Sequence, residues 1–276
     1  MGRQIWGWIC TGYCLAVEPN NLLNHQSLVQ IGRRVLIEIV LACGSVPAIA
    51  APPIVAISDT EISKLAKEST IKITAPTVVF SGTIVYRNNN VYTVVTSAGN
   101  FKANPQTRYL ATSVDNRVRS VTGVKFLGKN LDLAMFQFSS GRNYRVAVLS
   151  KQIESLKPGA TVYVSGYGYS NSTTIDTDKA LFNITAGKLI INSSQPIDNT
   201  GYSLVYNNAT LLGQGGGAVW NDRGEAIGIH SDGDLSNEVV TSPINPEIRQ
   251  IKAKHKGISI DTVRKLLAED PNFQGL

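Results

Sequence analysis

Residues 212–230 read LGQGGGAVWNDRGEAIGIH, and this is the stretch of the chain that indicates its fold most clearly. It begins with four glycines within residues 213–217 and continues with two short apolar runs, separated by the turn sequence Asp-Arg-Gly at 222–224. The runs predict strands at 217–220 and 225–230. A tight turn needs only one or two glycines, so four of them predict that another group approaches this backbone closely. A phosphate-binding loop would require a following helix and a Lys-Ser/Thr pair, whereas a strand follows here.

Outward from this stretch, short β-branched runs alternate with turn residues over most of the chain. A first series of six strands is predicted at 71–74, 78–86, 91–96, 109–114, 117–127 and 132–138. A second series of six is predicted at 161–166, 180–191, 203–206, 217–220, 225–230 and 238–241. The clearest hairpin signal between strands is the run of three asparagines at 88–90.

The number of strands decides the architecture, because twelve short strands are too many for one flat sheet. We therefore predict an all-β fold of two packed six-stranded antiparallel β-barrels, which leaves few sheet edges exposed. Residues 52–150 would form an N-terminal helix and the first barrel, and residues 151–276 the second barrel and a C-terminal helix. The helices are predicted at 58–68, where Ser58 begins a capping box, and at 259–268.

A leader is predicted over residues 1–51. Residues 31–52, IGRRVLIEIVLACGSVPAIAAP, combine a basic pair, an apolar stretch too short to span a bilayer and a small-residue cleavage pattern at 48–50. This is the outline of a secretory signal peptide, so we expect an exported protein, periplasmic or extracellular, without a stable membrane span. Glu38 interrupts the apolar stretch, which leaves a buried N-terminal helix as an alternative, and a lipid-modified Cys43 is a second alternative.

The cysteines and histidines limit the chemistry of the main body. Every cysteine lies at or before residue 43, so no disulfide framework or cysteine-based zinc site is expected after it. The three histidines, His25, His230 and His255, are far apart and none belongs to a ligand-spaced pair, so neither a metal nor a cofactor is predicted. The net charge of +6 comes without a run of like charges or a basic stripe interleaved with aromatics, so no nucleic-acid partner is predicted.

Several motifs, taken in order along the chain, resemble those of the trypsin-like serine proteases of chymotrypsin fold, in particular their bacterial exported branch. In that family the catalytic base follows a strand of the type Tyr-Thr-Val-Leu-Thr-x-Ala-His, and here residues 92–98, YTVVTSA, lead to Gly99. The family's acid stands in an Asp-Leu-Ala strand, which Asp132 and its neighbours match. The nucleophile loop reads Gly-x-Ser-Gly-Gly-Pro, and residues 213–218 match it with Gly215 at the serine position.

The resemblance extends over residues 60–243 and implies a role for each matching position. Asp132 corresponds to the catalytic acid, Gly99 stands at the position of the base and Gly215 at that of the nucleophile. The family's oxyanion hole consists of backbone N–H groups at the positions of Gly213 and Gly215, and glycine keeps this donor. The residues implied to line the substrate pocket are Leu211, Leu212, Ile229, His230 and Ser231.

The two glycines predict the loss of the family's reaction. Peptide hydrolysis by this mechanism needs a hydroxyl to attack and an imidazole to accept its proton, and neither Gly99 nor Gly215 has a side chain. We therefore expect an inactive relative that keeps a cleft for a peptide or protein ligand. Two alternatives stay open: an active endopeptidase that uses displaced catalytic groups, and an interaction domain whose cleft is closed. The sequence predicts no oligomeric state.

Several of these side chains also have purely structural interpretations. Asp132 would then accept hydrogen bonds from backbone N–H groups at the start of a strand, and His230 would be a hydrogen-bonded histidine at a strand end. His255 lies in the basic stretch 252–256 and is expected in a solvated segment. The hydroxyls nearest to the matched positions, none with an obvious base, are Ser97, Thr210 and Ser231.

Overall fold

The computed structural model describes one β-rich body. The described residues are 56–103, 105–169, 177–231, 239–240, 251–252, 255–270 and 273. Every described element belongs to the unit Ile54–Leu276. The predicted leader lies outside the described residues. Within the described ranges, no helix has the length and apolar character needed to cross a membrane.

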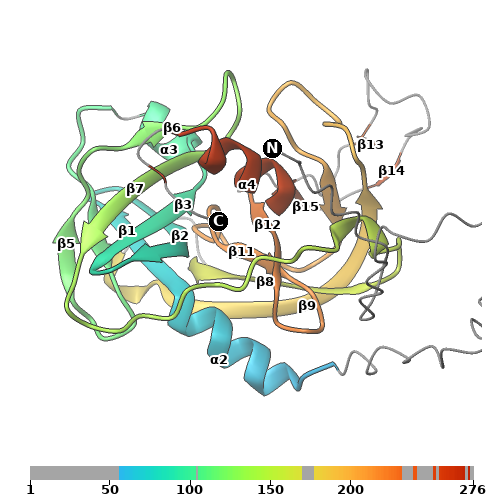
Figure 1. The fold of residues 1–276 in the computed structure, drawn as a ribbon, viewed down its shortest axis with the longest axis horizontal. Coiled ribbons are helices and arrows are strands. Elements are labelled where there is room, and N and C mark those ends of the chain that lie inside the picture. Colours follow the sequence, from blue (N-terminus) through green and yellow to red (C-terminus); the bar gives the residue numbers. More distant parts are fainter. Residues whose placement is uncertain are drawn as a thin grey trace, which may run out of the picture. The chain divides into compact units, whose positions relative to one another are not determined.

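Seven antiparallel strands form the first sheet, in the order β5-β4-β1-β2-β3-β7-β6 (Figure 1). Their bounds are β1 Thr70–Ala75, β2 Val78–Asn88, β3 Val91–Thr96, β4 Leu110–Thr112, β5 Val118–Ser120, β6 Lys125–Phe126 and β7 Ala134–Ser139. The sheet curls around a core that includes the fully buried side chains of Phe80, Tyr92 and Phe136. The strand predicted at 117–127 is divided into β5 and β6, and Gly123 adopts a positive φ of 63° between them.

Six antiparallel strands close the second barrel, in the order β10-β15-β12-β11-β8-β9. Their bounds are β8 Thr161–Gly168, β9 Leu181–Asn192, β10 Leu204–Tyr206, β11 Ala218–Trp220, β12 Ala226–His230 and β15 His255–Ser259. The predicted fold class, an all-β pair of packed trypsin-like barrels, is therefore confirmed, with a curled seven-stranded sheet as the first of the two.

The strand that completes the second barrel differs from the predicted one. A strand does exist near 238–241, namely β13 Val239–Val240, but it pairs with β14 Ile251–Lys252 in a separate two-stranded sheet. The barrel is instead closed by β15, which pairs with both β10 and β12. Its sequence HKGIS adjoins a basic stretch that was expected to be solvated, yet it pairs on both sides and four of its five residues are buried.

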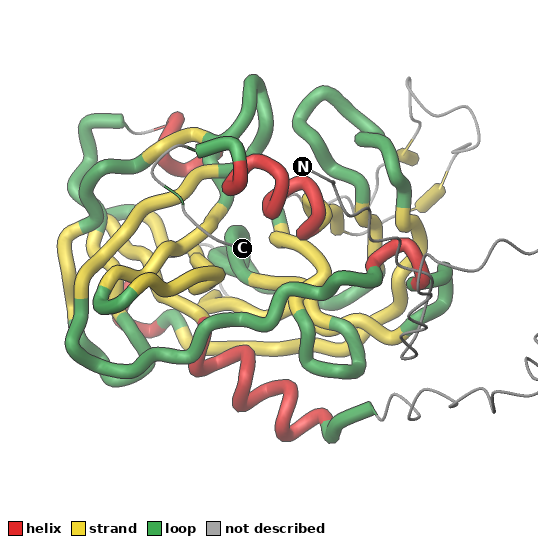
Figure 2. Tube along the Cα trace, viewed as in Figure 1, coloured by secondary structure: helices red, strands yellow, loops and turns green. Residues whose placement is uncertain are grey.

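Both predicted terminal helices are present, and helices are few (Figure 2). Helix α2, Asp59–Ser69, begins where Ser58 Oγ accepts the Glu61 N–H at 3.2 Å, and it buries Ile62 and Ala66 in one apolar cluster with Trp220 of β11. Further elements are the short helix α3 Gly99–Ala103, helix α4 Ile260–Ala268, and the 3₁₀ turns Ile153–Ser155 and Thr177–Lys179.

The two sheets meet along β2 and the glycine-rich loop. Ser81 of β2 donates its N–H to Gly215 O at 2.8 Å and its hydroxyl to Gly213 O at 2.9 Å. Thr83, two residues along the same strand, donates its hydroxyl to Gly216 O at 3.2 Å. Three bonds from one strand therefore fix the loop against the first sheet, and a β-carbon on Gly216 would lie 3.0 Å from Ser97 N, directly after the end of β3.

Candidate functional site

The carboxylate of Asp132 lies beside Gly99, as the resemblance implies. Strand β3 ends at Thr96, and the chain turns into α3, so that the N–H groups of Ala98 and Gly99 both point at Asp132 Oδ1, each at 2.8 Å. A β-carbon on Gly99 would lie 3.6 Å from the same oxygen, which is ordinary van der Waals contact. A side chain at position 99 would therefore start next to this carboxylate. The two backbone bonds also agree with the structural interpretation of Asp132.

The second oxygen of Asp132 is bound by a side chain that the sequence analysis missed. The Tyr202 hydroxyl donates to Asp132 Oδ2 at 2.7 Å and lies 2.6 Å from Ser231 Oγ, which is itself 3.4 Å from Oδ2. Burial, and then the charge of Asp132, raises the pKa of the Tyr202 hydroxyl well above its ordinary value. The tyrosine is therefore a neutral donor that keeps its proton. No local pattern signals this contact, because Tyr202 and Asp132 are seventy residues apart.

The backbone of the glycine loop is buried, and the chain's own strands are the groups that approach it. Gly213 has a φ of 101°, and a β-carbon there would come within 2.8 Å of Tyr167 O. On Gly217 a β-carbon would overlap with Ser165 O in β8. Glycine is therefore required at these positions by strand packing, which explains the unusual run without invoking a ligand.

The residue between the first two glycines of the loop is an anchor. Gln214 is fully buried, and its Oε1 accepts the Leu211 N–H at 2.6 Å while its Nε2 donates to Asn183 O at 3.2 Å. Gly217 also donates its N–H to Gln214 O, at 2.9 Å. The loop is thus held from within as well as by β2, and its conformation does not depend on a side chain at Gly215.

The five residues implied to line a pocket do not share one environment. Leu212 is 47% exposed and Leu211 is half-buried, whereas Ile229, His230 and Ser231 are at most 6% exposed. The neighbouring segments 170–176 and 232–238 lie outside the described residues. Substrate binding at these residues therefore stays a prediction, with the two leucines as its accessible part.

His230 is a buried histidine at the end of β12. Its Nδ1 lies 2.7 Å from the Tyr206 hydroxyl, which also donates to Lys256 O. Burial, and then the nearby His255, lowers the pKa of His230 to about 3. The ring is therefore neutral at ordinary pH, in agreement with the structural interpretation of this residue.

His255 is not solvated, and the expectation for it is wrong. It is 7% exposed, because it begins the internal strand β15, and its ring packs edge to face on His230 with centroids 5.6 Å apart. The Thr210 hydroxyl lies within 3.1 Å of both of its ring nitrogens. A hydroxyl and an imidazole thus do meet near the glycine loop, at a pair that the sequence did not suggest.

Within the described ranges, no three His, Cys, Asp or Glu side chains gather as ligands of a metal ion would. Two hollows of about 490 and 480 Å³ lie in the surface. The larger is lined by residues such as Asn192, Ser203 and Asp261, and the smaller by residues of the first sheet's turns such as Tyr144. Neither includes Gly99, Asp132 or Gly215 among its lining residues.

Comparisons with known proteins agree with the fold described above. Residues 80–229 match the model of the trypsin-like peptidase domain. The crystal structure of Deg5 superimposes with a TM-score of 0.53 and 18% identity over 76% of this chain and 94% of that one. A structure of the HtrA-type protease AlgW with a tripeptide superimposes with a TM-score of 0.54 and 14% identity, over 77% of this chain but only 63% of that one. At these identities the structures show a shared fold alone. A search of curated protein sequences found no match.

Proposed function

The chain belongs to the family of trypsin-like peptidase domains, and we propose that it is a member that no longer cleaves peptides. One observation carries the proposal. The carboxylate that would orient a catalytic imidazole beside Gly99 instead accepts the Tyr202 hydroxyl, at 2.7 Å from Asp132 Oδ2. The acid is therefore part of a completed hydrogen-bond group that contains no base.

The chemistry of the family's reaction explains why this arrangement is expected to be inactive. A hydroxyl must attack the peptide carbonyl while an imidazole takes its proton, and the carboxylate holds that imidazole in the right tautomer. Gly215 supplies no hydroxyl and Gly99 no imidazole. Tyr202 cannot act as the base, because its raised pKa keeps it protonated. The nearby Ser97 is 4% exposed and Ser231 is bonded to Tyr202, so neither is positioned to replace the nucleophile.

Peptide binding is the activity that we propose to remain. The accessible Leu211 and Leu212 border the glycine loop, whose Gly213 and Gly215 stand at the family's oxyanion positions. A peptide bound there would be held without being cut. The burial of the whole loop favours a second candidate, an interaction domain whose cleft is closed. Titration with a library of apolar peptides separates the two: binding that Leu212→Glu abolishes supports an open cleft, and no binding to any peptide supports a closed one.

Rebuilding the site tests the proposal. We expect that Gly99→His with Gly215→Ser restores weak casein hydrolysis, and that adding Tyr202→Phe increases it, because the new imidazole then no longer competes for Asp132. An independent readout is the titration of the new histidine by NMR. Its pKa is expected to rise when Tyr202→Phe is added, since pairing with a carboxylate favours the charged ring.

These measurements also contain results that would count against the proposal. Casein hydrolysis by the unmodified chain, above that of a heat-treated sample, would contradict the loss of activity. An unchanged histidine pKa on adding Tyr202→Phe would show that the tyrosine does not compete for the carboxylate, even if the unmodified chain is inactive.

If the chain is instead an active endopeptidase with displaced catalytic groups, Thr210 and His255 are the candidate pair. A hydroxyl within 3.1 Å of an imidazole is the minimal nucleophile and base. If the unmodified chain hydrolyses casein, Thr210→Val should abolish that hydrolysis, while Ser97→Ala should not. Hydrolysis that survives Thr210→Val would exclude this pair.

We also propose that the protein is exported and that residues 1–51 are its leader. The support is the order of basic pair, apolar stretch and small-residue pattern in residues 31–52. Expression of the full chain followed by N-terminal sequencing of the exported fraction should give a start near Ala51. A product that keeps residues 31–50 and stays in the cytosol would contradict export.

A further inference from the structure

The positive charge of the protein is concentrated in the first half of its main body. Residues 70–150 hold ten lysines and arginines but only two acidic residues, whereas residues 151–276 hold eleven and thirteen. The formal charge is therefore +8 over the first of these ranges and −2 over the second. An excess of this size on one part of a protein attracts anionic partners and speeds their encounter.

Half of the ten cations are arginines that gather where the turns of the first sheet meet, and we call this surface the arginine end. Its members are Arg87, Arg117, Arg119, Arg142 and Arg145. The acidic side chains that pair with them are Asp115, with Arg117, and Glu68, with Arg145. Five cations against two anions leave an excess of positive charge at this surface.

Arg119 is the structural centre of the arginine end. Its guanidinium donates to Ser113 Oγ and to the Tyr144 hydroxyl, each at 2.6 Å, and lies over the ring of Phe138 at 4.7 Å from the centroid. It also reaches Ser140 Oγ at 3.4 Å. These contacts connect the turn after β4 to the turn after β7. The N–H donors of the Arg119 guanidinium are therefore bonded within the protein.

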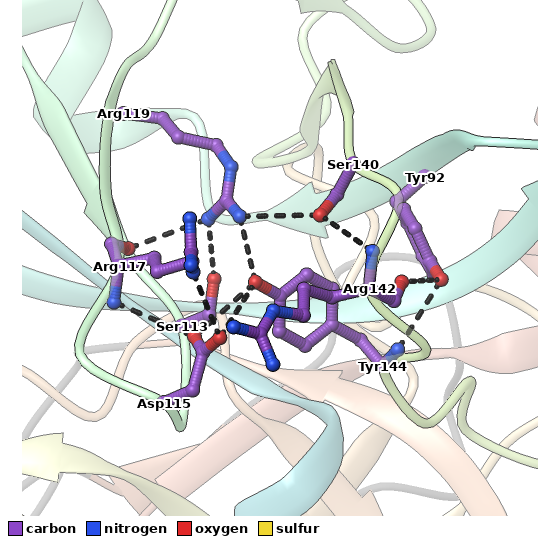
Figure 3. Close-up of polar contacts among 8 residues, drawn as sticks. All are labelled: Tyr92, Ser113, Asp115, Arg117, Arg119, Ser140, Arg142 and Tyr144. Atoms are coloured by element: carbon purple, nitrogen blue, oxygen red, sulfur yellow. Dashed lines mark hydrogen bonds and ion pairs between the residues drawn. The ribbon is translucent and has the colours of Figure 1, made fainter.

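Two neighbouring arginines, Arg117 and Arg142, have fewer polar contacts than Arg119 (Figure 3). Arg117 is 56% exposed and makes a single loose ion pair, 3.5 Å from Asp115 Oδ2. Arg142 is exposed, and its guanidinium has no hydrogen-bond or ion-pair partner among the residues that the structure describes. Figure 3 shows how Asp115 is linked to this group: it pairs with Arg117, and both of its oxygens accept the Tyr144 hydroxyl at 3.2 Å, which also accepts from Arg119.

A hollow of about 480 Å³ opens beside these side chains. Its lining residues are Glu68, Val114, Asn143, Tyr144, Arg145 and Val146. Val114 and Val146 give it apolar walls, and Val148, two residues further along, is 60% exposed. Its size is within the range of known ligand sites. Arg145 and Glu68 in its lining pair with each other at 2.7 Å, so the positive charge next to the hollow is that of Arg142, the neighbour of Asn143 in the chain. Apolar walls beside such a cation suit a ligand with both acidic and apolar groups.

We propose that the arginine end binds an acidic peptide segment of a partner protein. Carboxylates of the segment pair with Arg117 and Arg142, and its apolar side chains pack against Val114 and Val146. A nucleic acid fits less well, because bases bind single-stranded sites by stacking on exposed aromatic rings, and the rings here, Tyr92 and Tyr144, are 0% and 7% exposed. This surface is independent of the proposed loss of proteolysis, which concerns other residues.

Fluorescence anisotropy tests the proposal with three labelled probes. They are a peptide of alternating glutamate and valine, the same peptide with lysine in place of glutamate, and a single-stranded oligonucleotide of equal charge. We expect the acidic peptide to bind and its affinity to fall by about tenfold or more in Arg117→Gln/Arg142→Gln, because two charge-assisted pairs are lost. The matched control, Lys64→Gln/Lys151→Gln, removes the same charge from exposed positions elsewhere and should change the affinity less than about twofold.

Each other result has a definite meaning. Equal weakening in the arginine and lysine variants would show that only net charge matters and would overturn the site. Tighter binding of the oligonucleotide than of the acidic peptide would overturn the proposed partner class. Absence of acidic-peptide binding at low salt would overturn the proposal as a whole. Thermal melting of both double variants checks that they fold, which is expected because Arg119 is left in place.

Discussion

On the first-sheet side of the matched site, Asp132 Oδ1 accepts two backbone N–H groups, and its Oδ2 accepts the hydroxyl of Tyr202, which lies between β9 and β10 of the second barrel. On the second-barrel side, the glycine loop has no reactive side chain, yet its backbone is held by β2 and by Gln214. The first side is held by bonds between side chains, and the second by bonds to the backbone of the loop.

The difference shows which residues at this site are required by the packing of the fold. Glycine is required at 213 and 217 because neighbouring strands lie close to both positions. This requirement does not depend on whether the site is catalytic. Position 99 differs, because a β-carbon there would make only an ordinary contact with Asp132 Oδ1, at 3.6 Å. The half-buried carboxylate of Asp132 is satisfied by two backbone N–H groups and by the Tyr202 hydroxyl. Substitutions on the two sides are therefore expected to change the free energy of unfolding by different amounts.

The largest effect is expected on the second-barrel side, from Gly217→Ala. The added β-carbon would overlap with Ser165 O, and β8 cannot yield easily because it pairs with both β9 and β11. We expect the free energy of unfolding, measured in urea, to fall by about 3 kcal/mol. Gly141→Ala is the matched control, since no atom lies within 4 Å of its β-carbon, and it should change stability by less than about 0.5 kcal/mol. Equal stabilities of the two variants would refute the packing requirement.

On the first-sheet side, Asp132→Ala should cost about 2 kcal/mol in the same measurement. It leaves the Tyr202 hydroxyl and the N–H groups of Ala98 and Gly99 without their acceptor, and unpaired donors are costly where water is largely excluded. In this account the aspartate stabilises the fold. A variant as stable as the parent would show that Asp132 has no structural role.

The histidine pair gives the second barrel a pH dependence. His230 has its pKa lowered to about 3, against about 6.5 in an unfolded chain, so between these values the unfolded state binds a proton that the folded state does not. The free energy of unfolding should be constant with respect to this group above pH 6.5. It should fall by up to about 1.4 kcal/mol for each pH unit between pH 6.5 and about pH 3. The groups facing the ring are His255, Tyr206 and Lys256. His230→Phe should flatten the unfolding free energy between pH 6.5 and pH 4, and an unchanged slope would assign the dependence to other groups.

The smallest effect is expected from Tyr202→Phe, about 1 kcal/mol. The hydrogen bonds of the hydroxyl to Asp132 and to Ser231 are removed, but Ser231 Oγ, 3.4 Å from Oδ2, is then free to donate to the carboxylate in its place. Urea unfolding beside Asp132→Ala gives the comparison directly. If Tyr202→Phe cost more than Asp132→Ala, the ring packing of the tyrosine rather than its hydroxyl would be its main contribution.

Much of this fold could be predicted from local patterns. The alternation of β-branched runs and turns gave the two barrels, and the Ser58 capping box gave helix α2, because these signals depend on neighbouring residues. The strand at 255–259 was missed because it continues a lysine-rich stretch, although four of its five residues are buried. The contacts of Tyr202 with Asp132 and of Thr210 with His255 span 70 and 45 residues, and only the closure of the barrels brings them together.

The most direct measurement of the central claim is intact-mass spectrometry of the unmodified protein after exposure to a fluorophosphonate probe, with trypsin as the positive control. The reagent modifies hydroxyls that a neighbouring base has activated, so it tests for a working nucleophile without assuming a substrate. With glycine at 99 and 215 and Tyr202 bonded to Asp132, we predict no mass shift beyond that of a heat-treated sample. A single adduct that heat treatment abolishes would contradict the account.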